Sequence, residues 1–163
     1  VGISGGIIDL SGLDKLTSLG LWRIRGGSVN MSTLPNSLTS LGLDTVGISG
    51  DIIDLSGRDK LTSLELDNMR GVSVNMSTLP NSLTDLTLDT VGISGGIIDL
   101  SGLVNLTSLQ LLDLSYVTGS CQDVSTILDN NKKLTKDSCY VDISLNKPCH
   151  NLSRCTITNI NSP

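Results

Sequence analysis

The stretch Leu-Thr-Ser-Leu-Gly-Leu at residues 16–21 decides the fold, because it returns four more times at a nearly constant spacing. The copies read LTSLGL from Leu38, LTSLEL from Leu61, LTDLTL from Leu83 and LTSLQL from Leu106. The steps between them are 22, 23, 22 and 23 residues. A fixed period of this length indicates an array of stacked supersecondary units. In each copy the Leu-x-Leu alternation predicts a short strand with its leucines on one face.

A longer period of 45 residues shows that the units come in pairs. The segment VGISGGIIDLSG at residue 1 returns as VGISGDIIDLSG at residue 46 and as VGISGGIIDLSG at residue 91. Between these segments stands a second type, SVNMSTLPNS, at residues 28–37 and 73–82. Its prolines, Pro35 and Pro80, interrupt regular structure, and its serines favour turns. We therefore expect extended or turn-like connections between strands rather than long helices.

These units resemble leucine-rich repeats, whose pattern is LxxLxLxxNxL. The resemblance covers about residues 1–118, and the segment around Ile53 is similar to the xGxIPxxL of plant-type extracellular members, with Ile in place of Pro. It implies a repeat solenoid, a right-handed superhelix with a parallel β-sheet on its concave face and few helices. The chain departs from the pattern at the Asn position, which holds Ile24, Val46, Met69, Val91 and Leu114. Backbone pairing or other polar groups must then satisfy the turn that the family's Asn serves.

The remaining residues, 119–163, lack the repeat and contain every cysteine of the chain, namely Cys121, Cys139, Cys149 and Cys155. Their even number and clustering favour two disulfides, in any of three pairings, and hence an oxidising compartment. A zinc site is the alternative, although no paired CxxC occurs. A helix is predicted over 121–130 and a strand over Cys139 to Leu145. The segment resembles the cysteine-bearing C-terminal caps of secreted leucine-rich-repeat proteins.

Composition narrows the classes of partner. The net charge of −5 argues against nucleic acid and anionic membrane surfaces. No apolar run approaches the ~18 residues that a membrane span needs. The near-absence of aromatic residues suits a solenoid, whose narrow interior Leu, Ile and Val can fill. Val1 opens inside a repeat unit without a signal peptide, so we expect upstream repeats or a lost N-terminal cap.

Four Asn-x-Ser/Thr triplets predict glycosylation sites, at Asn30, Asn75, Asn105 and Asn151. Whether sugar is attached depends on the source organism. Together with the clustered cysteines, these triplets favour an extracellular location, secreted or at the cell surface.

Differences between the repeated blocks point to the strand positions. Residues 1–45 and 46–90 differ at nine positions, and five of these are among the eight outward strand positions of a block. Nine changes placed by chance among 45 positions would put about 1.6 on those eight. A copied scaffold with a varied strand face is typical of a recognition surface. The alternative is free drift of exposed positions.

Stacking aligns equivalent residues into columns, which predicts a partner-binding face. Its candidate residues are Trp22, Arg23, Asp44, Glu65, Asp67, Asp85, Asp89, Gln110, Leu112 and Asp113. Like charges at strand spacing repel, so the acidic middle of this face favours a basic partner or a cation. The alternative is a solvated acidic face that aids solubility. Trp22 and Arg23 are residue types favoured at interface hot spots, unless Trp22 packs against an upstream repeat.

These observations favour a non-enzymatic module that binds a protein partner, because a glycan would call for more exposed aromatic residues. The sole histidine, His150, has no nucleophile beside it, and no phosphate loop, GxSxG or HExxH occurs. We expect no cofactor and no metal. A structural spacer or stalk is the alternative function. Ice binding is a minor one, based on a ladder of threonines, Thr17, Thr39, Thr62, Thr84 and Thr107, which could instead hydrogen-bond the turn before each strand.

Overall fold

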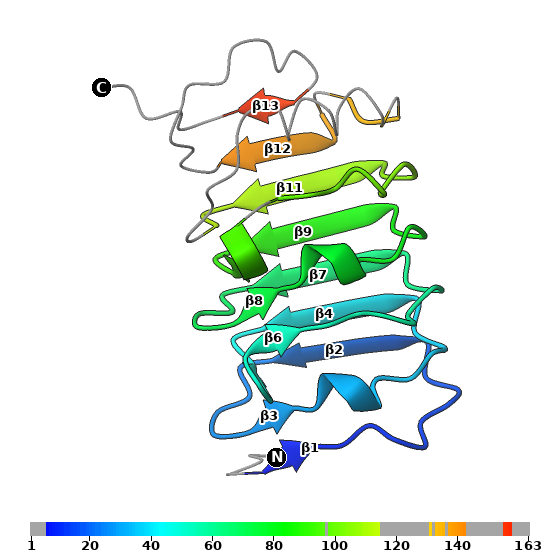
Figure 1. The fold of residues 1–163 in the computed structure, drawn as a ribbon, viewed down its shortest axis with the longest axis vertical. Helices are drawn as coiled ribbons and strands as arrows, with labels where there is room; N and C mark the ends of the chain where they lie inside the picture. Colours follow the sequence, from blue (N-terminus) through cyan, green and yellow to red (C-terminus); the bar gives the residue numbers. More distant parts are fainter. Residues whose placement is uncertain are drawn as a thin grey trace.

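The chain coils into a parallel β-solenoid with few helices (Figure 1). The computed structural model describes residues 6–96, 98–114, 131, 133–135, 137–142 and 155–157. Its main sheet has seven parallel strands in the order β13-β12-β11-β9-β7-β4-β2. The strands are β2 Ser18–Trp22, β4 Ser40–Asp44, β7 Ser63–Asp67, β9 Asp85–Asp89, β11 Ser108–Leu112, β12 Cys139–Asp142 and β13 Thr156–Ile157. The predicted repeat solenoid with one parallel strand per repeat is therefore confirmed.

Equivalent residues of successive repeats pair directly across the main sheet. Leu41 of β4 lies opposite Leu19 of β2 on one side and Leu64 of β7 on the other. The same register continues from β7 to β9 and from β9 to β11. The inward leucines of β4, β7 and β9 are at most 1% exposed. The two leucines of each strand thus form continuous rows in the core, as the alternation predicts.

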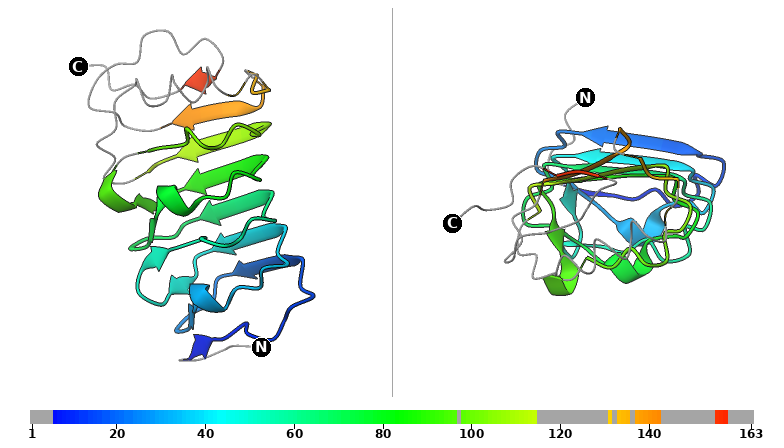
Figure 2. Two further views of the ribbon diagram at one scale, coloured as in Figure 1. Left: turned by 45° about the vertical axis from the view of Figure 1, so that its right-hand side comes forward. Right: turned by 90° about the horizontal axis from the view of Figure 1, so that it is seen from above.

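The wall opposite the main sheet consists of short strands and turns of 3₁₀ helix (Figure 2). Strands β1 Ile7–Ile8, β3 Ser28–Val29 and β5 Gly47–Ile48 form one three-stranded parallel sheet. Strands β6 Ile52–Ile53, β8 Ser73–Val74 and β10 Gly92–Ile93 form another. The 3₁₀ helices are η1 Met31–Thr33, η2 Met76–Thr78 and η3 Ser94–Gly96. The expectation of extended and turn-like connections is thus confirmed.

Polar side chains fix the turns of this wall. The Asn30 side chain accepts a hydrogen bond from the Ser32 backbone N–H at 3.2 Å and so caps η1. In the Asp-Leu-Ser segment, the Asp54 carboxylate accepts from the hydroxyl and the backbone N–H of Ser56. These bonds hold the pKa of Asp54 below its ordinary value, with the hydroxyl contributing most. Hydrogen bonds between side chains and nearby backbone groups therefore stabilise the turns of this wall, where a longer helix would use its own backbone hydrogen bonds.

Apolar residues fill the position where the leucine-rich-repeat pattern has Asn. Val46, Met69 and Val91 are all buried there. The preceding residue adopts a left-handed backbone conformation, as at Thr45 with φ 53°. Its N–H then donates to the carbonyl of Asp67 on the next strand, at 3.1 Å. Backbone pairing therefore satisfies this turn, and the position is free to contribute to the core.

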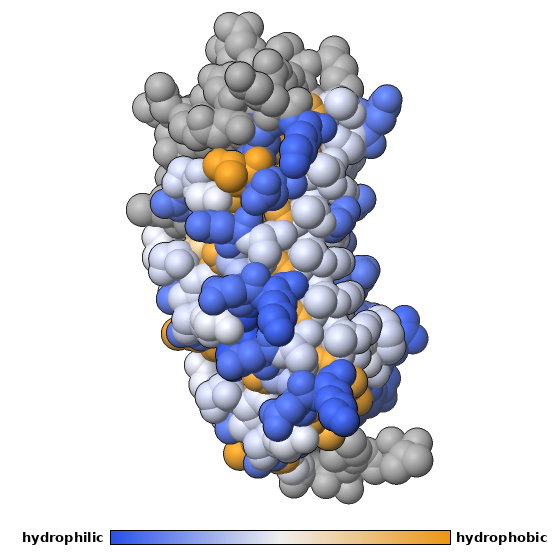
Figure 3. Space-filling model, turned by 90° about the vertical axis from the view of Figure 1, so that its right-hand side faces the viewer, coloured by the Kyte–Doolittle hydropathy of each residue, from blue (hydrophilic) through white to orange (hydrophobic). Residues whose placement is uncertain are grey.

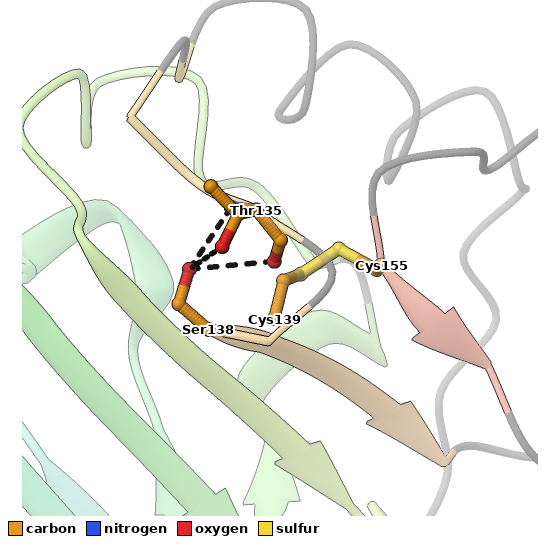
Figure 4. Close-up of a disulfide and its surroundings, with 4 residues drawn as sticks. All are labelled: Thr135, Ser138, Cys139 and Cys155. Carbon is orange, nitrogen blue, oxygen red and sulfur yellow. Dashed lines mark hydrogen bonds between the residues drawn. A yellow bond between two sulfur atoms is a disulfide. The ribbon is translucent and has the colours of Figure 1, made fainter.

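One disulfide joins the last two strands that the structure describes (Figure 4). It links Cys139, the first residue of β12, to Cys155, which precedes β13, with their Cα atoms 4.7 Å apart. The predicted strand from Cys139 is confirmed as far as Asp142, and its Val141 side chain is buried as expected. Cys121, Cys149 and the helix predicted over 121–130 lie outside the described residues. No helix in the described ranges has the length and apolar character to cross a membrane.

Candidate binding face

The outward side of strands β2, β4, β7, β9, β11 and β12, which we call the strand face, carries the residues predicted to bind a partner. The second and fourth residues of the five-residue strands are leucines that point into the core, as Cys139 and Val141 do on β12, so the residues that alternate with them point outward. Trp22, Glu65, Asp85 and Gln110 are exposed, and Asp44, Asp67, Asp89 and Leu112 are half-buried. Arg23 and Asp113 directly follow β2 and β11 and are exposed. The structure therefore places eight of the ten predicted residues in strands of one sheet and the other two at the ends of such strands.

Three aspartates form a column at the ends of neighbouring strands. Asp44 pairs in register with Trp22 on one side and with Asp67 on the other, and Asp89 ends the next strand. Successive strands lie about 4.8 Å apart. Burial raises the pKa of Asp67 above its ordinary value, and the negative charges of Asp89, Asp44 and, least, Glu65 raise it further. The negative charges of the column therefore repel one another, and no positive charge of the column offsets this repulsion.

Each carboxylate of this column is held by the residue that follows it. The Thr45 hydroxyl donates to Oδ1 of Asp44 at 2.6 Å, and the Thr90 hydroxyl donates to Oδ1 of Asp89 at 2.8 Å. The same contact to Asp67 comes from the Asn68 side-chain N–H, at 2.9 Å. These three following residues all have positive φ, which for a β-branched threonine is unusual and costs energy. The strained turns orient three carboxylates in the same way.

Asp85 does not belong to this column. It begins β9, whereas Asp89 ends it, and the four residue steps between them separate their Cα atoms by about 13 Å. Its Oδ2 atom lies 2.6 Å from the Thr84 hydroxyl, whose single proton can be donated to it or to the Thr62 carbonyl. The acidic side chains therefore occupy the length of the strands rather than a single point.

An aromatic side chain stands at one end of the strand face. Trp22 is 64% exposed although it lies in a strand. Its indole lies over the backbone of Gly20, where a Cβ atom would overlap the ring carbon Cη2. Arg23 follows in the left-handed conformation, with φ 54°. The ring thus presents a flat apolar surface beside the acidic column.

Two residues of the strand face were not predicted. Tyr140 pairs in register with Gln110, and Asp142 pairs with Leu112, which itself pairs with Asp89, so β12 continues the aspartate column through Asp142. The signal for them was the predicted alternation from Cys139, because Val141 inward requires its neighbours outward. Five strand spacings of about 4.8 Å separate β2 from β12. Trp22 on β2 and Tyr140 on β12 therefore lie on opposite sides of the strands that carry the acidic residues, about 24 Å apart across the sheet.

The threonine ladder is engaged with the backbone. The hydroxyls of Thr39, Thr62, Thr84 and Thr107 each donate to the carbonyl of the preceding threonine in the ladder, at 3.0–3.1 Å. The N–H groups of the same residues donate to the same carbonyls. The predicted hydrogen bonding of the turn before each strand is thus confirmed.

The predicted glycosylation sites differ in their contacts. The Oδ1 atoms of Asn30 and Asn75 accept from the serines two residues later. The Nδ2 atom of Asn105 instead donates to the carbonyl of Asn81 at 3.0 Å. Asn151 lies outside the described residues, as does His150.

Within the described residues, no three His, Cys, Asp or Glu side chains are grouped so that they could hold a metal ion. Comparison of the chain with family models, with characterised proteins and with solved structures found no match. The strand face must therefore be interpreted from its own chemistry.

Proposed function

We propose that the chain is a non-enzymatic recognition module of the leucine-rich-repeat type, which binds a basic segment of a protein partner through the strand face. The column of Asp44, Asp67 and Asp89 carries this proposal. Its carboxylates repeat at the strand spacing, and each is held through Oδ1 by the residue that follows. In the described part of the chain, no hydrogen bond reaches the Oδ2 atoms of Asp44 and Asp89. An Arg or Lys side chain can donate to such oxygens.

The raised pKa of Asp67 supports a cationic partner. Its carboxylate is half-buried among like charges, so a bound cation would offset both the repulsion and the lost hydration. Trp22 adds apolar contact at the edge of the column, and Trp and Arg are favoured hot-spot types. A protein segment with spaced basic side chains supplies both kinds of contact.

Variation between the repeated blocks also supports recognition. Five of the nine differences between residues 1–45 and 46–90 change outward residues of the main strands or the residue that follows. Among them are the exchanges of Trp22 for Asp67 and of Gly20 for Glu65. The inward leucines of the main strands, and the turn residues Asp9 and Asn30, have identical counterparts in the second block. The scaffold is therefore constant while the chemistry of the strand face varies along it.

An extracellular location fits this function. The Cys139–Cys155 bond requires an oxidising environment, and the triplets at Asn30 and Asn75 are suited to glycosylation in a secretory pathway. Binding by this face requires no cofactor.

The experiment measures binding of a synthetic ten-residue peptide with alternating Arg and Ser by fluorescence anisotropy. The triple variant Asp44→Asn, Asp67→Asn, Asp89→Asn should bind at least tenfold more weakly than the unaltered chain. The control carries Asp51→Asn, Asp59→Asn and Asp137→Asn, which remove the same charge from exposed residues outside the strand face. It should bind within twofold of the unaltered chain. Equal losses in both variants, or no binding to the unaltered chain, would refute the proposal.

A spacer or stalk is the second candidate, and the near-identical blocks with identical backbone register support it. A spacer would tolerate both triple variants equally. The engagement of the threonine hydroxyls with carbonyls gives that ladder a structural role and leaves ice binding with less support.

A further inference from the structure

A groove lies on the flank of the solenoid where the loops lead into the main strands. Its volume is about 590 Å³. Three successive coils line it, through residues 10–12 and 14, residues 32–37, and residues 58 and 60. Figure 3 faces this flank and shows strongly hydrophilic side chains gathered in separate clusters along it. The groove is separate from the strand face, so a ligand would bind in it whether or not the strand face binds a basic partner.

The groove arises from the alternation of the two coil types. Residues 32–37 belong to the proline-containing coil, whereas 10–14 and 58–60 belong to the Asp-Leu-Ser-Gly coils on either side. Leu10, Leu34 and Pro35 contribute buried apolar atoms to its lining. The remaining lining is polar, with hydroxyl, amide and charged groups. A small-molecule site combines such an apolar surface with a few placed polar groups, in a volume of this order.

Arg58 is the distinctive residue of the groove. The first and third copies of the block have Leu13 and Leu103 at its position. Arg58 is half-buried, and its guanidinium donates from Nη1 to Oδ1 of Asn36 and from Nη2 to the Ser32 carbonyl. Its Nε atom is buried without a hydrogen-bond partner. The Arg58 guanidinium has five N–H donors, and not all of them have an acceptor.

The guanidinium also has no carboxylate in direct contact among the described residues. Its attraction is the last of four effects on the pKa of Asp54, whose main contacts are with Ser56. Lys60 adds a second cation to the lining, and Asp14 contributes a carboxylate. A half-buried cation without an anion is costly, which favours an anionic ligand.

The corresponding place one block later lacks this chemistry. Leu103 stands there in place of Arg58 and is buried. Asn105 replaces Lys60 and donates instead to the Asn81 carbonyl at 3.0 Å. The cationic groove is therefore a feature of one coil and not of the repeat.

We propose that this groove binds an acidic saccharide of one or two sugar units. Its anionic group would lie against Arg58 and Lys60, with charge-assisted hydrogen bonds from the guanidinium. Its hydroxyls would donate to the Asp14 carboxylate, which has no affinity for a bare anion. The volume exceeds what a single inorganic anion fills, and the apolar lining suits the C–H surface of a sugar ring.

The test uses D-glucuronic acid as the probe with the full chain in low-salt buffer at pH 7. Titration followed by two-dimensional NMR should shift the backbone signals of residues 10–14, 32–37 and 58–60. D-glucose and sodium acetate should each bind at least tenfold more weakly, because each supplies only half of the contacts. Equal binding of acetate and glucuronate would refute the saccharide assignment, and absence of glucuronate binding would refute the site.

Two variants locate the site. Arg58→Leu introduces the residue that this scaffold already accommodates at Leu103, and should weaken glucuronate binding at least tenfold. Arg70→Leu removes the same charge from an exposed residue that does not line the groove, and should leave binding within twofold. If Arg58→Leu impairs folding by circular dichroism, Lys60→Gln takes its place with the same expectation. Unchanged binding in the folded groove variant would overturn the proposal, whereas its binding of the basic peptide should be unaltered.

Discussion

The indole of Trp22 lies over the backbone of Gly20, two residues earlier on strand β2, and the missing side chain at residue 20 makes this position of the ring possible. The later blocks exchange both residues together, for Glu65 with Asp67 and for Gln110 with Leu112. Glycine thus accompanies the only tryptophan of the chain. A ring held flat in advance loses less conformational freedom when a partner binds.

Substitution of Gly20 by alanine should displace the indole without unfolding the sheet. The added methyl would overlap the ring carbon Cη2, while alanine in place of a strand glycine is otherwise neutral or favourable. Because Trp22 is the sole tryptophan, its fluorescence spectrum and near-ultraviolet circular dichroism report this movement directly. Gly42→Ala is the control, since a Cβ atom there meets nothing within 4 Å. Identical spectra for Gly20→Ala and the unaltered chain would contradict the geometry.

Asp67→Asn should stabilise the chain at pH 7 and have no effect near pH 3. The raised pKa means that the folded state holds the Asp67 proton more tightly than the unfolded state. Stability therefore falls as the pH rises from about 4, the ordinary aspartate value, through the folded pKa. Asparagine removes that cost, which is a few tenths to about 1 kcal/mol for a half-exposed group.

Urea denaturation at the two pH values measures this difference, and Asp59→Asn, an exposed loop residue, is the control. The asparagine retains an oxygen that can accept from the Asn68 side chain, so local geometry is preserved. A gain of equal size at both pH values would show that charge is not its cause. Loss of the gain in 1 M salt is expected as well.

The sequence was sufficient to predict the strands and their pairing. Near-identical blocks such as 1–45 and 46–90 can stack only with equivalent residues aligned, and Leu-x-Leu decides which side faces the core. The outward columns follow from the same alignment. This is why eight of the ten predicted residues lie on strands of the main sheet, while Arg23 and Asp113 directly follow such strands.

Features that depend on side-chain conformation or on coil size could not be predicted in this way. The contact between Trp22 and Gly20 requires knowledge of the indole rotamer. The groove at Arg58 requires the relative extent of three neighbouring coils. Tyr140 follows the end of the repeat, so only the alternation from Cys139 marked it as outward, and no aligned copy placed it in a column of the strand face. The alignment of repeats predicts the outward residues of the main sheet only in the part of the chain where the repeat continues.

Thr62→Val should cost little stability, about 0.5 kcal/mol. The Thr62 hydroxyl donates to the Thr39 carbonyl at 3.0 Å, but the N–H groups of Thr62 and Ser63 donate to the same oxygen at 2.8 and 3.0 Å. Removal of the hydroxyl therefore leaves no unsatisfied group, and only the small net value of one hydrogen bond is lost. A shift in the urea midpoint tests this. Ice crystals grown with the variant should have the same shape as those grown with the unaltered chain. A difference in crystal shape would show that the threonine ladder binds ice.

Replacement of Cys139 and Cys155 by alanine should loosen the last strands only. The bond closes a segment with a sequence separation of 16, for which loop-closure entropy gives about 3 kcal/mol. In a solenoid each coil contacts its neighbours, so this loss stays near β12 and β13. Amide hydrogen exchange should rise around Val141 and remain slow at Leu41 and Leu64. A uniform rise along the main sheet would contradict the local character of the effect.

The identical register at every step has a consequence for the size of the molecule. The junction between residues 45 and 46 uses the same backbone bonds as any other step of the main sheet. One more block, or one fewer, would change the length by two strand spacings, about 10 Å, and would need no new contact at either junction. The length of the solenoid along its axis can therefore change in steps of one block, through duplication or deletion of the corresponding gene segment.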